Sequence, residues 1–136
     1  MAIRALCIDD DVKSEKFQSK SQLLLEEGVQ LIPIDNVDDA LVAVSKEKFD
    51  IILLDIMMPV GTFGPDETNG GISSGLVLLR RIRNAGCKAP VIVVTVREKA
   101  DIEPLVEELG ITEILNKPSE SLAAPTLAAI HAALGK

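Results

Sequence analysis

The chain has 136 residues, of which 47% are hydrophobic and 26% charged, and this predicts one globular domain over residues 1–136. Its formal net charge is −7, and only 2% of its residues are aromatic, with no Trp or Tyr. An acidic surface with few rings disfavours direct nucleic-acid binding, which depends on neutralising phosphates and stacking on bases.

Neither a targeting segment nor a membrane span is predicted. The first residues lack a long apolar core with a cleavage site, and the longest uncharged stretch near the end, 122–134, is too short to cross a bilayer. Two cysteines, Cys7 and Cys87, do not make a disulfide framework, and we expect both to be reduced thiols. These features predict a cytoplasmic protein.

The first half of the chain alternates between strand and helix. The predicted elements are, in order, a strand at Ile3–Ile8, a helix at Val12–Glu27, a strand at Val29–Ile34 and a helix at Val37–Lys48. Gly28 is a C-terminal signal for the first helix. Asn36 is a predicted N-cap for the second.

The second half continues the alternation. Its predicted elements are a strand at Ile51–Leu54, a helix at Gly75–Asn84, a strand at Val91–Val94, a helix at Asp101–Leu109, a strand at Thr112–Leu115 and a last helix that becomes regular near Pro125 and ends at Leu134. Gly110 ends the helix before the fifth strand. Five strands alternating with five helices predict an α/β fold with a doubly wound, parallel sheet.

One connection is much longer than the others. Residues 60–74, between the third strand and the third helix, include four glycines, whereas such loops usually have about two to six residues. Two interpretations stay open. The loop is either a flexible insertion, tolerated because loop entropy grows slowly with length, or a lid or docking element beside the functional site.

Four apolar strands end in polar residues. Asp9 follows the first, Asp55 the third, Thr95 the fourth, and Asn116 with Lys117 the fifth. In an open α/β sheet the ligand site lies beyond the carboxyl ends of the strands. We therefore expect carboxylates, a hydroxyl and an ammonium group to meet in one crevice.

The carboxylates in this crevice predict a cation site. Asp9, Asp10 and Asp11 face Asp55 if the first and third strands are neighbours, and two carboxylates about 4 Å apart repel by about 4 kcal/mol at an effective dielectric near 20. Either one is protonated or a cation lies between them. Oxygen ligands suit Mg²⁺, and no zinc-like Cys/His set exists in the sequence. The alternative is that the three aspartates cap the first helix.

The same set of residues suits phosphoryl chemistry. Asp55 can act as a nucleophile and form an acyl phosphate, while Mg²⁺, Lys117 and Thr95 stabilise the phosphoryl oxygens. The alternative for Lys117 is an ordinary solvated lysine, although the following Pro118 fixes the backbone there. The single histidine, His131, lies in the predicted last helix, and no glycine-rich phosphate loop is present.

Four motifs in order resemble a response-regulator receiver domain over essentially the whole chain. They are CIDDD at 7–11, FDIILLDIMMP at 49–59, PVIVVT at 90–95 and ILNKP at 114–118. The resemblance implies a flavodoxin-like three-layer sandwich with strand order 2-1-3-4-5. It also implies a two-component or phosphorelay system.

The resemblance implies a role for each site residue. Asp55 would be the phosphoacceptor and a Mg²⁺ ligand, Asp10 would bind Mg²⁺ directly, Asp9 would act through water, and Met57 would offer its backbone carbonyl. The acidic pair could instead be Asp10 and Asp11.

On the phosphoryl side, Thr95 would move toward the phosphoryl group and Lys117 would pair with it. Met57 and Arg97 occupy positions that influence phosphoryl lifetime in similar domains. Two positions depart from the family pattern. Ile114 stands where an aromatic switch residue is usual, and Val96 stands where a small residue is usual.

The implied partners are a sensor histidine kinase or a histidine phosphotransfer protein, and a downstream protein target. The resemblance implies no nucleic-acid or membrane contact, a monomer or weak homodimer, and a phosphate acceptor rather than a turnover enzyme. A receiver-like adaptor that signals without phosphorylation is the alternative. An aspartyl-phosphate phosphatase is disfavoured because Met57 stands where its second aspartate would be.

Overall fold

A computed structural model of the chain describes residues 3–9, 15–55, 74–95, 109–116 and 123–135. Strands and helices alternate in these ranges: β1 Ile3–Ile8, α1 Glu15–Glu26, β2 Val29–Ile34, α2 Val37–Lys46, β3 Ile51–Asp55, α4 Ser74–Asn84, β4 Val91–Thr95, β5 Ile111–Asn116 and α8 Ala123–Leu134. All five predicted strands are confirmed, with shifts of one residue at some ends. The helix expected over 101–109 lies outside the described residues except for its last position, Leu109, which is helical.

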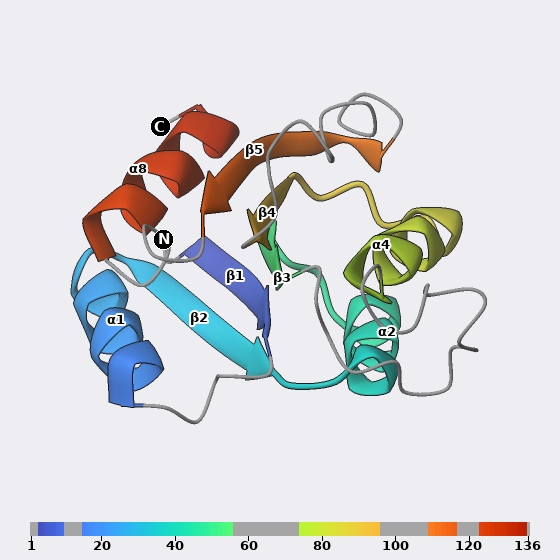
Figure 1. Ribbon diagram of the computed structural model, residues 1–136, viewed down its shortest axis with the longest axis horizontal. Helices are drawn as coiled ribbons and strands as arrows, with labels where there is room; N and C mark the ends of the chain where they lie inside the picture. The colour runs from blue at the N-terminus through green and yellow to red at the C-terminus, as the bar shows by residue number, and fades with distance from the viewer. Residues whose placement is uncertain (1–2, 10–14, 56–73, 96–108, 117–122, 136) are drawn as a thin grey trace.

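The five strands form one parallel sheet in the order β2-β1-β3-β4-β5 (Figure 1). This order confirms the doubly wound topology. It makes β1 and β3 neighbours, in a register that pairs Ile8 with Leu54. The polar residues that follow these two strands therefore come to the same edge of the sheet.

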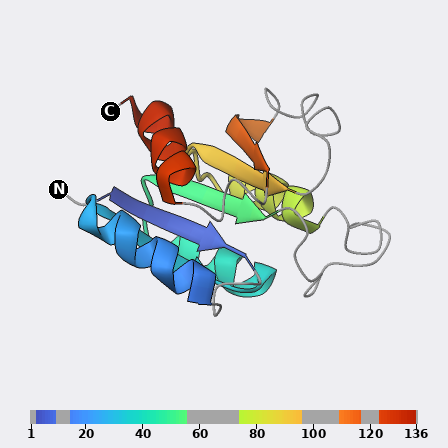
Figure 2. The ribbon, with the colours of Figure 1, turned by 60° about the vertical axis from the view of Figure 1, so that its left-hand side comes forward.

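Helices cover both faces of the sheet. α1 and α8 lie on one face, and α2 packs beside α4 on the other (Figures 1 and 2). Alternate residues of each inner strand point to opposite faces, so that Leu6 joins the cluster under α2 and α4 while Cys7 joins the cluster under α1 and α8. The three-layer sandwich is therefore confirmed.

Inner and edge strands differ in burial. Every residue of β3 is buried, as expected for a strand covered on both faces. The edge strands are only partly covered, with Gln30 exposed in β2 and Glu113 exposed in β5. The expectation of burial on both faces is thus confirmed for β3, whereas β5 is exposed in part because it is the last strand of the sheet.

The predicted helix-end signals are confirmed. The Asn36 side chain accepts a hydrogen bond from the backbone N–H of Asp39 at 2.8 Å, which makes it the N-cap of α2. Gly28, just beyond α1, has a φ of +86°, a conformation that side chains with a Cβ disfavour. α2 ends at Lys46, two residues before the predicted end, because Glu47 has extended backbone angles.

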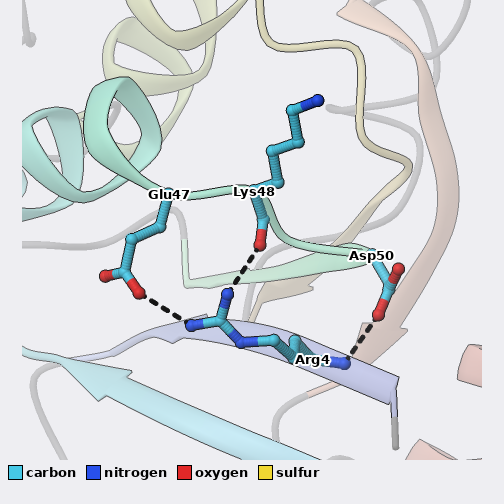
Figure 3. Close-up of polar contacts among 4 residues, drawn as sticks. All are labelled: Arg4, Glu47, Lys48 and Asp50. Carbon is cyan, nitrogen blue, oxygen red and sulfur yellow. Dashed lines mark hydrogen bonds and ion pairs between the residues drawn. The ribbon is translucent and has the colours of Figure 1, made fainter. Parts of the chain in front are cut away.

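Arg4 fastens the loop between α2 and β3 to β1 (Figure 3). Its guanidinium donates to the carbonyl oxygen of Lys48 at 3.0 Å and to Oε1 of Glu47 at 2.8 Å, and its backbone N–H donates to Oδ2 of Asp50 at 2.8 Å. The guanidinium also lies 5.1 Å from the centre of the Phe49 ring, a cation–π distance.

Arg83 performs a similar task at the end of α4. Its guanidinium donates to four backbone carbonyl oxygens, those of Cys87 and Ala89 before β4 and those of Leu109 and Gly110 before β5. Burial lowers the pKa of Arg83, with Cys87 acting in the opposite direction, and the guanidinium stays charged at neutral pH. One side chain thus joins the starts of two neighbouring strands.

Replacing Arg83 should destabilise the fold. Arg83→Met leaves four carbonyl groups without their donor, and we expect a loss of about 1–3 kcal/mol in the free energy of unfolding. Arg83→Lys is the matched variant, since it keeps the charge but loses the planar fork, and it should lose most of the same free energy. Urea unfolding measures both, and wild-type stability in either variant would contradict this role.

Gly110 should tolerate a side chain less well than Gly28. Both have positive φ, so Gly→Ala at either should cost about 1–2 kcal/mol for the left-handed conformation. A Cβ at Gly110 would also lie 3.0 Å from Nη2 of Arg83, whereas a Cβ at Gly28 meets nothing within 4 Å. We expect Gly110→Ala to lose about 1 kcal/mol more than Gly28→Ala in urea unfolding, through overpacking.

An Arg83→Met background provides the control for this comparison. The excess loss at Gly110 should disappear there, because the guanidinium that the new methyl group would meet is absent. Equal losses for the two glycine variants in the wild-type background would show that Arg83 moves aside freely.

Candidate functional site

The polar residues that end the strands lie at one edge of the sheet, as predicted. Asp55, Thr95 and Asn116 are the last residues of β3, β4 and β5, and Asp9 directly follows β1. The pairing runs to these ends, with Asp55 opposite Val94 and Thr95 opposite Asn116. The structure therefore brings these four strand ends to one edge of the sheet, and the crevice with its side-chain roles stays a prediction.

Asp9 and Asp55 are both buried, each with 6% of its surface exposed. Carboxylates are seldom buried at this level unless they are paired, and each of these two takes part in a polar interaction within the protein. Because neighbouring parallel strands lie about 4.8 Å apart, two carboxylates at adjacent strand ends repel each other unless a proton or a cation intervenes.

The backbone holds both aspartates firmly. The N–H of Asp9 donates to the carbonyl oxygen of Ile34 at 3.1 Å, which extends the pairing of β1 with β2 past the last residue of the strand. Asp55 belongs to β3, which pairs with β1 on one side and β4 on the other. The pairing of the sheet therefore fixes the backbone of both residues.

The oxygen donors at this edge fit a hard divalent cation. Two carboxylates at neighbouring strand ends are the kind of set that Mg²⁺ takes, since it keeps several waters and binds one or two protein carboxylates. Within the described ranges no cluster of three or more His, Cys, Asp or Glu side chains is found. The cluster predicted from the sequence needs Asp10, which lies outside them.

Several predicted site residues cannot be placed by the structure. Asp10, Asp11, Met57, Lys117 and Pro118 lie outside the described residues, as do Val96, Arg97 and the loop at 60–73. Thr95 is placed by its backbone alone. The structure therefore brings together Asp9, Asp55 and the backbone of Thr95, and the other assignments stay predictions.

Ile114 has a place in the structure that its sequence position alone did not indicate. It lies in β5, opposite Val93, with 8% of its surface exposed, and belongs to the apolar cluster under α2 and α4. The residue that stands at the family's aromatic position is thus part of the core. An aliphatic residue at an alternating position of an edge strand was the available signal.

Two further observations concern the cysteines and the helices. Cys7 and Cys87 do not form a disulfide. Among the helices that the structure describes, none combines the length and hydropathy needed to cross a bilayer.

Comparison with known proteins agrees with this geometry. Residues 5–125 match the family model of the response regulator receiver domain. The uncharacterized transcriptional regulatory protein YkoG of Bacillus subtilis is 32% identical over 130 residues, which cover 95% of this chain and 50% of YkoG. The chain spans about half the length of the curated transcriptional regulators that it matches.

Solved structures share the fold. A CheY-like response regulator receiver domain from Methanospirillum hungatei superposes with a TM-score of 0.76 at 21% identity, covering 99% of this chain and 95% of that one. A response regulator from Burkholderia pseudomallei, solved with a phosphorylated aspartic acid, a calcium ion and citrate, gives a TM-score of 0.68 at 24% identity, over 94% of this chain and 66% of that one.

The family match covers most of the chain, includes both buried aspartates, and agrees with the strand order and the polar edge. Receiver domains serve in two-component signal transduction, as phosphoacceptors rather than turnover enzymes. The chain belongs to the response regulator receiver domain family.

Proposed function

We propose that the chain accepts a phosphoryl group on Asp55 and that the phosphorylated form switches a protein partner. The donor would be a phosphohistidine on a sensor histidine kinase or on a histidine phosphotransfer protein. The observation that carries the proposal is the burial of Asp55 at the carboxyl end of β3, beside the equally buried Asp9. In keeping with the family, we infer that this takes place in the cytoplasm.

The transfer itself is a displacement at phosphorus. A carboxylate oxygen of Asp55 attacks, the bond between phosphorus and the imidazole nitrogen of the donor breaks, and that nitrogen keeps the electron pair. The product is an acyl phosphate on Asp55. Because β3 is buried along its whole length and paired on both sides, the attacking group is held in place before the donor arrives.

Mg²⁺ would supply positive charge for the phosphoryl oxygens. Asp55, Asp10 and the backbone carbonyl of Met57 would bind it directly, and Asp9 would do so through water. The burial of Asp9 and Asp55 at neighbouring strand ends supports this, since a cation would stabilise two carboxylates there. The calcium ion in the phosphorylated Burkholderia regulator supports a divalent cation in this fold.

On the other side of the phosphoryl group we propose Thr95 and Lys117. Thr95 ends β4, directly after Val94, which pairs with Asp55, and this position supports a hydroxyl that donates to a phosphoryl oxygen. Lys117 follows Asn116, the register partner of Thr95, and would contribute its ammonium charge. Both groups would favour the phosphorylated form over the free carboxylate.

A phosphodonor experiment tests the proposal. The wild-type chain incubated with acetyl phosphate and Mg²⁺ should gain one phosphoryl group by intact mass, and a chelator should prevent the gain. Asp55→Asn should gain none. Asp50→Asn is the matched control, because it changes an aspartate at the opposite edge whose role as a hydrogen-bond acceptor an amide oxygen can keep.

Two results would overturn the proposal: no gain by the folded wild type, or an equal gain by Asp55→Asn. The first would favour the second candidate function, a receiver-like adaptor that binds its partner without phosphorylation. The observation in favour of that candidate is Ile114, which is aliphatic and buried where the family usually has an aromatic switch residue.

We further propose that the chain is a single receiver domain in which the loop predicted at about 60–74 acts as a lid or a docking element beside the phosphorylation site. The loop begins five residues after Asp55 and leads into α4, which starts at Ser74. Deleting residues 61–72 should shorten the half-life of the phosphoryl group on Asp55 several-fold, because a lid excludes the attacking water. An unchanged half-life together with unchanged partner selectivity would contradict the lid.

A further inference from the structure

A groove of about 500 Å³ lies at the amino edge of the sheet, opposite the edge of Asp9 and Asp55. Its two walls are residues 44–49, which lead from α2 into β3, and residues 85–89, which lead from α4 into β4. Figure 1 shows α2 and α4 side by side, and both helices end at this edge. Of the predicted phosphorylation-site residues that the structure describes, neither Asp9 nor Asp55 lines the groove.

Positive charge gathers around this groove in an otherwise acidic protein. The chain has a net charge of −7, yet the groove is lined by Lys46, Lys48 and Lys88. The carboxylate among its lining residues, Glu47, is bound by Arg4 at 2.8 Å. Figure 3 shows the Lys48 side chain extending away from Arg4 while the Glu47 carboxylate turns toward it.

The carbonyl groups at the ends of the two helices accept hydrogen bonds from donors other than these lysines. The carbonyls in the last turn of α4 accept from Gly86 and Cys87 N–H groups, and Ala43 in α2 accepts from the N–H of Glu47. In the loop after α4, the carbonyl groups of Cys87 and Ala89 accept hydrogen bonds from Arg83. In the part of the chain that the structure describes, none of the three lysines forms a salt bridge with a carboxylate.

Apolar residues also line the groove. Val44, Phe49 and Ala89 are partly buried and pack against the core cluster under α2 and α4, and Ala85 is exposed beside them. The groove is thus lined by apolar and charged residues together, and its volume falls in the range of sites for small ligands. The combination calls for a ligand with an apolar body and a negative head.

We propose that this groove binds a small amphipathic carboxylate, such as a medium-chain fatty acid. Its aliphatic chain would lie against Val44, Phe49 and Ala89, and its carboxylate would be bound by the lysines on the two walls. Charge complementarity with the three lysines distinguishes this ligand from a neutral or cationic amphiphile. The proposal is independent of phosphorylation at Asp55.

A titration of the isotope-labelled full chain with octanoate, followed by NMR, tests the proposal. We expect saturable shifts concentrated in the amides of 44–49 and 85–89. Octylammonium, which has the same chain and the opposite charge, should give no saturable shifts there, and neither should acetate, which lacks the chain. Raised salt should weaken octanoate binding, because the lysines are exposed.

A variant that lacks the three lysine charges provides a second test of the proposal. The triple variant Lys46→Gln, Lys48→Gln, Lys88→Gln should bind octanoate at least about tenfold more weakly, a difference of one order of magnitude in Kd. Lys16→Gln is the matched control, because Lys16 belongs to α1 on the other face of the sheet, and it should bind like the wild type. If the triple variant does not fold, the comparison of octanoate with octylammonium on the wild type still tests the proposal.

Three results would overturn the proposal. They are an absence of saturable octanoate shifts at the groove, equal binding of octanoate and octylammonium, or wild-type affinity in a folded triple variant. Binding of an acidic peptide without binding of octanoate would also overturn it, since the occupant would then be a segment of a protein partner.

Discussion

Two buried carboxylates at neighbouring strand ends are the constraint on which the rest of this structure depends. Asp9 directly follows β1, and Asp55 is the last residue of β3. Aliphatic clusters pack against these two strands on both faces of the sheet. Close packing prevents the strands from separating to relieve the repulsion between the two side chains. Buried carboxylates are stabilised by nearby donors or cations, and this supports the edge as the candidate site.

The two edges of the sheet are built differently. At the amino edge, Arg4 and Arg83 bind backbone carbonyls of the loops that enter β3, β4 and β5, so positive side chains satisfy polar groups of the main chain. At the carboxyl edge the buried charges are negative and come from the strand ends themselves. Arginine side chains thus bind the loops where the strands begin, and the candidate site residues lie where the strands end, as ligand sites do in other open α/β sheets.

Local patterns in the sequence were enough to predict much of the fold and the strand ends at which the candidate site lies. Short apolar runs located the strands to within one residue, and Asn36 and Gly28 marked helix ends through hydrogen bonds and a backbone angle that involve near neighbours only. The polar residues after the strands located Asp9 and Asp55, because the carboxyl ends of parallel strands always meet at one edge. The strand order came from the family resemblance rather than from any local pattern.

Features made by contacts between distant residues could not be predicted in this way. Arg83 reads as a surface position of a helix, and only the tertiary structure brings Leu109 and Gly110, 26 and 27 residues away, to its guanidinium. The groove has the same origin, since Lys48 and Lys88 come from loops that meet only after α2 has packed against α4. Such sites have no spacing in the sequence that could reveal them.

The position of Ile114 bears on how a signal could pass from the proposed site to the surface, and not on the chemistry of the site. Its side chain is packed in the cluster under α2 and α4, and moving an isoleucine from the core to water costs about 1.5–3 kcal/mol. A rotation of this side chain between buried and exposed positions is therefore unfavourable. Isoleucine lacks the polar group that would offset this cost for a tyrosine. Under the proposed function, a change at Asp55 would reach the surface more readily through the ends of β4 and β5. Thr95 and Asn116 are register partners there, and each ends its strand.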